Sequence, residues 1–107
     1  MNNVNLIGRL TRDPEMLYTQ QGLGITEFGL AVDRRTKDDD ADFFDVVSFG
    51  KLAESVGNNL GKGRLVGVSG RLQQDRWTNS EGQNRSKVKV IASQVDFLDW
   101  PKDDAPF

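Results

Sequence analysis

Cysteine and histidine are both absent from the 107 residues of this chain. Without them the chain has no disulfide, no thiol nucleophile, no imidazole general base and none of the usual zinc ligands. Long apolar runs are also missing, since no stretch approaches the about 20 apolar residues of a membrane span. Residues 1–7 lack the basic segment and the apolar core of a signal peptide. We therefore expect a single cytoplasmic domain with no membrane partner.

Excess positive charge is lacking as well, because the formal net charge is −2 and the isoelectric point is near 5.0. Taken as a total, this charge argues against a nucleic-acid binder. Its distribution points the other way. Acidic residues gather in 38–42 and in the tail from 96 to 104, whereas residues 71–89 carry regularly spaced cations.

The segment 71–89 has the pattern of a β-hairpin with one basic face. Side chains at alternate positions of a strand share a face, and the shared parity holds Arg71, Gln73, Asp75 and Trp77 before the loop and Arg85, Lys87 and Lys89 after it. Residues 78–83 are polar with one glycine, as is typical of a hairpin loop. A ring among cations suits single-stranded nucleic acid, because bases stack on π surfaces and phosphates bind positive charge. The same pattern also fits a solvated strand face on which Trp77 packs against a neighbour.

Alternating apolar residues predict five strands, at residues 3–10, 25–32, 42–49, 65–77 and 85–97. Asp13-Pro14 ends the first strand, and residues 18–24 are expected to turn into the second. Two glycines, Gly67 and Gly70, indicate a bend or bulge in the fourth strand.

One short helix is predicted between the third and fourth strands. Leu52, Val56 and Leu60 recur every four residues across 51–60, and glycines end the helix at 61 and 63. This order of elements predicts an all-β fold, a five-stranded OB-fold barrel with one helix between strands 3 and 4. We expect the OB-fold domain at residues 1–99 and a short acidic tail at 100–107, where prolines prevent a further strand.

Three aromatic side chains are candidates for base stacking. Phe43 and Phe49 share a parity on the third strand, and Trp77 ends the fourth. Each stacked base contributes roughly 1–3 kcal/mol, and any base can stack. The candidates for phosphate contacts are the cations around the fold: Arg9, Arg34, Arg35, Lys37, Lys51, Lys62, Arg71, Arg76, Arg85, Lys87 and Lys89.

Three other patterns approach known phosphate, metal or catalytic motifs, but their residues or spacing do not match those motifs. Residues 57–63 approach a phosphate-binding loop, but a spacer residue is missing, a glycine replaces the magnesium-binding hydroxyl, and the glycines follow a helix. Residues 38–42 lack the alternating ligands and the downstream glutamate of a calcium loop. A nuclease needs converging carboxylates, and Asp45 and Asp75 are single residues beside aromatics. We therefore expect no enzyme, with no catalytic residues, no metal site and no cofactor.

Four segments, in order along nearly the whole chain, resemble the bacterial single-stranded DNA-binding proteins. They are VNLIGRLTRDPE at 4–15, FDVVSFGKLAE at 44–54, the stretch 62–72 with its Lys62-Gly63 start and Gly70-Arg71-Leu72 end, and 77–85. The closing Asp103-Asp104-Ala105-Pro106-Phe107 resembles the acidic tip of that family. The resemblance implies an OB fold, a nucleoid-associated place in the cytoplasm, and sequence-nonspecific binding and protection of single-stranded DNA in replication, recombination and repair.

Carried over by position, the resemblance implies specific sites. The stacking aromatics of the family fall on Phe43, Phe49 and Trp77, while a further aromatic position, after the second strand, is occupied by Thr36. One stacking site is therefore expected to be lost. The family assembles as homotetramers through the first strand and the sheet faces, which gives as candidate contacts Asn3, Asn5, Ile7 and Phe44.

The tip in that family binds replication, recombination and repair proteins, with the final Phe in an apolar pocket and the acids on basic residues. The resemblance gives this partner-binding role to Asp103, Asp104, Ala105, Pro106 and Phe107. The long linker of housekeeping members is absent, as in short paralogues linked to DNA uptake or in phage-encoded versions. An acidic tail tethered this close to a basic groove is also expected to compete with DNA.

Two alternatives from other classes stay open. One is a protein-interaction module, an OB fold with a replication protein as its partner and only residual DNA affinity, like primosomal members of the wider family. The tip separates them, since an adaptor without a DNA role has less use for a groove competitor. The other is a carboxylate nuclease, which metal-dependent loss of labelled oligonucleotide would reveal.

Overall fold

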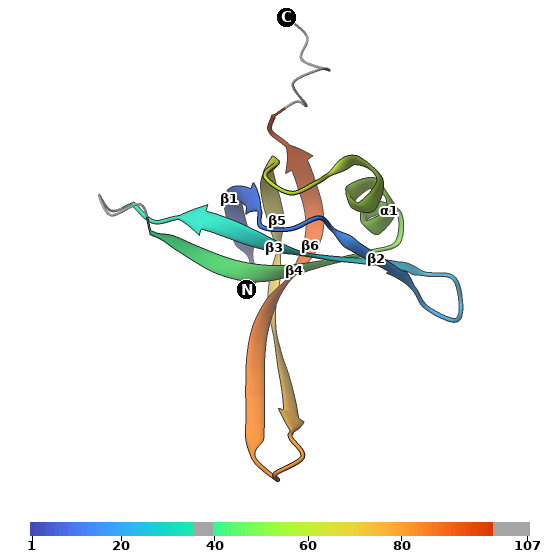
Figure 1. Ribbon diagram of the computed structural model, residues 1–107, viewed down its shortest axis with the longest axis vertical. Helices are drawn as coiled ribbons and strands as arrows, with labels where there is room; N and C mark the ends of the chain where they lie inside the picture. The colour runs from blue at the N-terminus through green and yellow to red at the C-terminus, as the bar shows by residue number, and fades with distance from the viewer. Residues whose placement is uncertain (36–39, 100–107) are drawn as a thin grey trace, which may run out of the picture.

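The computed structural model describes residues 1–35 and 40–99. These residues form β1 (Val4–Leu10), β2 (Glu15–Tyr18), β3 (Gly24–Asp33), β4 (Ala41–Phe49), α1 (Gly50–Asn59), β5 (Leu65–Thr78) and β6 (Asn84–Phe97). Five strands close into a ring in the order β1-β5-β6-β4-β3, because β3 pairs back to β1. The ring, with its helix between β4 and β5, confirms the all-β fold predicted from the sequence. Figure 1 shows the β5–β6 hairpin projecting away from the ring and from α1.

The short strand β2 is not among the predicted strands. It pairs with β3 from Glu15 opposite Glu27 to Tyr18 opposite Gly24, along the same edge of β3 that pairs with β1 through Leu10. Pro14 interrupts this edge, since it has no backbone N–H to donate. The chain therefore continues the edge in two pieces, and the expected turn is confined to the residues between β2 and β3.

The core fills the ring with inward side chains from every strand of the ring. Fully or nearly fully buried members are Leu10, Phe28, Leu30, Val46, Val66, Val68 and Val90. Burying one such side chain stabilises the fold by about 1.5–3 kcal/mol. The predicted stripe of α1 closes the same core, with Val56 at 0% exposure and Leu60 at 7%. Phe44 packs against this cluster within its own chain.

A β-bulge turns the β5–β6 hairpin away from the ring. The register of β5 and β6 shifts between Ser69 and Gly70, which confirms the bend predicted there. The pairing of β1 with β5 ends at the same point, with Val4 opposite Gly70. Asn2 then continues the edge with its side chain, donating to Leu72 O at 2.8 Å and accepting from Leu72 N–H at 2.9 Å.

Several predicted features fall outside the described residues, namely the tip at 103–107, Thr36 and Lys37. Among the residues that are described, no helix is both long and apolar enough to span a membrane.

Candidate nucleic-acid interface

One outer surface of the ring and hairpin gathers the predicted stacking residues and several cations. We call it the outer face. The parallel pairing of Val47 with Ile91 joins β4 to β6 on this side, and in the hairpin Asp75 lies opposite Lys87 and Trp77 opposite Arg85. Its side chains are Phe43, Asp45, Val47 and Phe49 of β4 and Arg71, Gln73, Asp75, Trp77, Arg85, Lys87 and Lys89 of the hairpin.

The three predicted stacking aromatics are all exposed on the outer face. Phe43 is 72% exposed, Phe49 is 42% exposed and Trp77 is 48% exposed. Phe43 and Phe49 are separated by about 20 Å along β4, at the usual rise of a strand, and Trp77 lies one residue before the end of β5. The rings are therefore separate π surfaces, and each can accept one base of a strand that crosses the face.

A groove of about 420 Å³ lies in the middle of the outer face. It is lined by Arg12, Glu27, Asp45, Val47, Asp75, Lys87 and Lys89. Cations and carboxylates are equal in number among these residues. The formal charge of the groove is therefore neutral, although the hairpin face alone is basic.

Ion pairs join the charges within the groove. Asp45 contacts Lys87 Nζ, and its Oδ1 lies 3.8 Å from Arg12 Nη2. Asp75 Oδ2 lies 2.8 Å from Lys89 Nζ, and its Oδ1 accepts a hydrogen bond of 3.0 Å from Gln73 Nε2. The contact with Lys89, followed by the bond from Gln73, lowers the pKa of Asp75 below its ordinary value of 3.8. Asp75 is therefore ionised at neutral pH.

Arg12 reaches the groove because β3 has a glycine where the side chain crosses it. Gly29 lies opposite Asp45 in the register of β3 and β4. A Cβ at position 29 would lie 2.7 Å from Arg12 Nη1 and would collide with Thr11 Oγ1. Arg12 is not among the predicted phosphate contacts, because only the folded turn after β1 brings it beside β4. The signal available in the sequence is the glycine itself, since a glycine inside a strand often marks a close approach.

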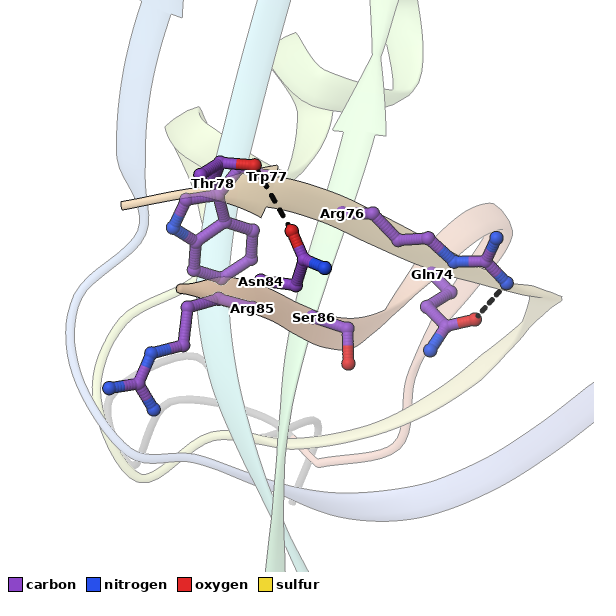
Figure 2. A pocket seen from close by; sticks show the side chains of 7 residues that line it. All are labelled: Gln74, Arg76, Trp77, Thr78, Asn84, Arg85 and Ser86. Atoms are coloured by element: carbon purple, nitrogen blue, oxygen red, sulfur yellow. Dashed lines mark hydrogen bonds between the residues drawn. The ribbon is translucent and has the colours of Figure 1, made fainter. Parts of the chain in front are cut away.

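A second hollow, of about 460 Å³, lies at the tip of the β5–β6 hairpin (Figure 2) and is lined by Gln74, Arg76, Trp77, Thr78, Asn84, Arg85 and Ser86. Trp77 and Arg85 are directly opposite each other across the two strands. Arg76 has the opposite parity, and its guanidinium donates to Gln74 Oε1 at 2.9 Å. Figure 2 shows Arg85 and Arg76 extending in opposite directions. The hairpin therefore presents a ring and a guanidinium together at Trp77, with Arg76 on its reverse face.

Two further predicted cations are held in ion pairs away from the groove. Arg34 Nη2 lies 2.8 Å from Asp42 Oδ1 where β3 and β4 meet their loop. The hydrogen bond from Arg34 lowers the pKa of Asp42, and the same bond raises the pKa of Arg34. Arg9 Nη1 donates to Gly63 O at 2.9 Å and lies 3.5 Å from Asp99 Oδ2.

The remaining candidates for phosphate contacts lie partly on the outer face and partly elsewhere on the surface. Arg71 lies on the outer face and donates to Gln73 Oε1 at 3.2 Å. Exposed cations also lie after β3, in the first turn of α1 and in the loop before β5, as Arg35, Lys51 and Lys62. The structure thus collects Arg71, Arg85, Lys87 and Lys89 on one face, with Arg76 on the reverse face of the hairpin and the other described candidates around the ring.

The carboxylates of the outer face are occupied by cations. Within residues 1–35 and 40–99, no three acidic side chains converge in a way that could hold a metal ion. Asp45 and Asp75, the strand residues that a nuclease would need, have lysine partners instead. Their arrangement is that of ion-pair partners.

Comparison with known proteins gives a consistent result over most of the chain. Residues 1–98 match the model of the single-strand binding protein family. A single-stranded DNA-binding protein of Clostridium tetani is 48% identical over 104 residues, which cover 94% of this chain and 72% of the relative. Proteins of the same name from Thermotoga maritima and Aquifex aeolicus are 46% and 43% identical, and the matches cover 92% and 95% of this chain and 74% and 73% of those relatives.

Proposed function

The chain belongs to the single-strand binding protein family, and on this premise we propose that it binds single-stranded DNA without selecting its sequence. The observation that supports this proposal best is the outer face, where exposed rings and cations lie together. Rings stack with any base and cations bind the phosphate of any nucleotide, so such a surface has affinity without base readout.

Residue roles follow from the positions on the outer face. Bases stack on Phe43, Phe49 and Trp77. The phosphates lie nearest the cations of the same face, which are Arg12, Arg71, Arg85, Lys87 and Lys89. A strand that continues beyond the outer face meets the remaining predicted contacts, which are Arg9, Arg34, Arg35, Lys51 and Lys62 around the ring and Arg76 on the reverse face of the hairpin. The chain acts as a binder and not as an enzyme.

Replacing a ring of the outer face should weaken the binding of oligo-dT. Each stack is worth about 1–3 kcal/mol, so Phe43→Ala or Phe49→Ala should raise the Kd by about 5- to 150-fold. The measurement is quenching of Trp77 fluorescence by oligo-dT across a salt series, with Trp77→Ala reporting the signal of Trp100. Log K should fall with log salt by about 0.7 per phosphate neutralised.

Phe97→Ala is the matched control, because Phe97 is 40% exposed but lies opposite Val66 at the far end of β6. It should leave the Kd unchanged. Unaltered affinity of a variant that lacks all three rings, measured by the anisotropy of labelled oligo-dT because this variant has no Trp77, would refute the proposal. If the wild type binds oligo-dT only weakly and substitution of Phe43 or Phe49 leaves the Kd unchanged, the protein-interaction module would be favoured.

We extend the proposal to the cellular role and assembly of the protein. Protection of single-stranded DNA serves replication, recombination and repair in the cytoplasm, and the tip at 103–107 recruits partner proteins of these processes. A homotetramer forms through Asn3, just before β1, and through Asn5 and Ile7 on the outward side of β1. Supporting this surface, Ile7 is a large apolar side chain with 63% exposure. Phe44 packs in its own core, so it contributes to the subunit contact only through its exposed part.

A further inference from the structure

The groove at the centre of the outer face holds its cations in ion pairs. Arg12 and Lys87 both contact Asp45, and Lys89 contacts Asp75. A phosphate that enters this groove therefore finds each of its three cations already in contact with a carboxylate of the same groove.

We infer that Asp45 and Asp75 limit the affinity of the outer face for single-stranded nucleic acid by competing with phosphates for Arg12, Lys87 and Lys89. This inference rests on the proposed function and adds to it the residues that set its strength. Both carboxylates lie among the stacking rings, with Asp45 between Phe43 and Phe49 on β4 and Asp75 two positions before Trp77 on β5. A strand that stacks on these rings cannot avoid them.

Asp45 has the central position of the two. It bridges a cation from the turn after β1 and a cation from β6, so one carboxylate engages two phosphate-binding groups. The pair partners are solvent-accessible, with the side chain of Asp45 34% exposed, that of Arg12 49% and that of Lys87 60%. Ion pairs at such exposed sites contribute little net stability. A phosphate can therefore open them, and the carboxylates act as competitors and not as a permanent block.

Competition leaves a bound phosphate close to the displaced carboxylate, and salt should screen the repulsion between them. When a phosphate takes the cation, the displaced carboxylate stays within a few ångströms of it, well inside the Debye length of about 8 Å at physiological salt. The two negative groups then repel each other. Replacing the carboxylate by an amide of the same shape removes this repulsion and leaves the cation free for the phosphate.

The test compares oligo-dT binding by wild type, Asp45→Asn, Asp75→Asn and the double variant across a salt series. Each single change should tighten binding by about two- to fivefold at low salt, the range expected for one exposed charge contact. Asp45→Asn should have the larger effect, because it frees two cations. The slope of log K against log salt should steepen by about 0.7 for each additional phosphate that the freed cations neutralise.

Asp96→Asn is the matched control, since it removes one negative charge from β6, opposite Gly67 and outside the groove. It should change the Kd by less than about 1.5-fold, the low end of an exposed charge contact. A double-mutant cycle adds a second readout, in which Lys87→Gln should cost more affinity in the Asp45→Asn background than in wild type, where Lys87 is shared. Far-UV circular dichroism and thermal unfolding confirm that the variants are folded.

Three outcomes would overturn the inference while wild-type binding stands. Unchanged Kd values would show that the carboxylates do not compete, and weaker binding would show that they hold the cations in position for phosphate. An equal gain from Asp96→Asn would show that only the net charge matters. A wild type that fails to bind oligo-dT would instead refute the proposed function itself.

Discussion

Arg64 and Asp99 fix the end of β6 to the rest of the fold. Arg64 Nε lies 2.9 Å from Asp99 Oδ1, and its Nη2 donates to Asp99 O at the same distance. Arg64 is only 18% exposed, and Arg9 approaches the other carboxylate oxygen at 3.5 Å. These contacts bring the ends of β1 and β6 together.

This contact should make stability depend on acid pH. The pKa of Asp99 lies below its ordinary value of 3.8, first because Arg64 donates to its carboxylate and further because Leu65 N–H, Arg64 and Arg9 favour the charged form. A lowered folded-state pKa stabilises the fold above 3.8, and this stabilisation disappears as the pH falls through the folded value. Asp99→Asn should lower the free energy of unfolding at pH 7 by about 0.5–1 kcal/mol. Urea unfolding should show that this difference shrinks as the pH falls below 3.8, and a difference independent of pH would contradict the assignment.

At the residue scale, the sequence predicts the face of a strand on which a side chain lies. It does not predict which side chains of other strands that side chain contacts. The face that Phe43 shares with Phe49, and the face of Trp77 on the hairpin, could be predicted, because alternation with period two is a local property. The pairing of Asp45 with Lys87 could not, since the two residues lie on β4 and β6 and meet only in the closed ring. The place of Arg12 in the groove could not be predicted for the same reason, since it depends on the folded turn after β1.

At the scale of elements, the β-bulge decides where the hairpin points. Gly70 lies where β5 leaves β1 and continues with β6 alone. A Cβ at this position would collide with the backbone carbonyl of Ile91, which no side-chain rearrangement can relieve. The glycine therefore lets two backbones approach and lets the hairpin carry Trp77 out from the ring.

Gly70→Ala should destabilise the fold, because the added methyl group must push one strand away. We expect a loss of about 1–3 kcal/mol in the free energy of unfolding, as for other overpacked sites. Gly67→Ala is the control on the same strand, since the nearest atom to its Cβ would be Leu98 Cδ1 at 3.6 Å, an ordinary van der Waals distance. Chemical denaturation of both variants tests this difference. Equal stability of the two would mean that the bulge tolerates a side chain.

The elements themselves were largely predictable, apart from one strand. The five strands of the ring have alternating apolar residues, and α1 has an apolar stripe, so each pattern is sufficient on its own. β2 has only four residues, and its burial is limited because it pairs along a single edge of β3. Its existence depends on the partner strand, which a local pattern cannot reveal.

At the scale of the whole molecule, charge is arranged along the length of β6. Arg85, Lys87 and Lys89 lie in its first half, and Asp96 and Asp99 lie near its end. The basic half of β6 belongs to the outer face, and the acidic residues Asp103 and Asp104 follow its acidic end in the sequence.

Deleting residues 103–107 should therefore tighten the binding of oligo-dT modestly, by about two- to fivefold at low salt, because tethered carboxylates compete at high effective concentration. The gain should vanish at high salt, where the Debye length shortens. Asp103→Asn with Asp104→Asn keeps the length of the tail and should reproduce most of the gain. Unchanged or weaker binding by the deletion variant at low salt would count against this competition.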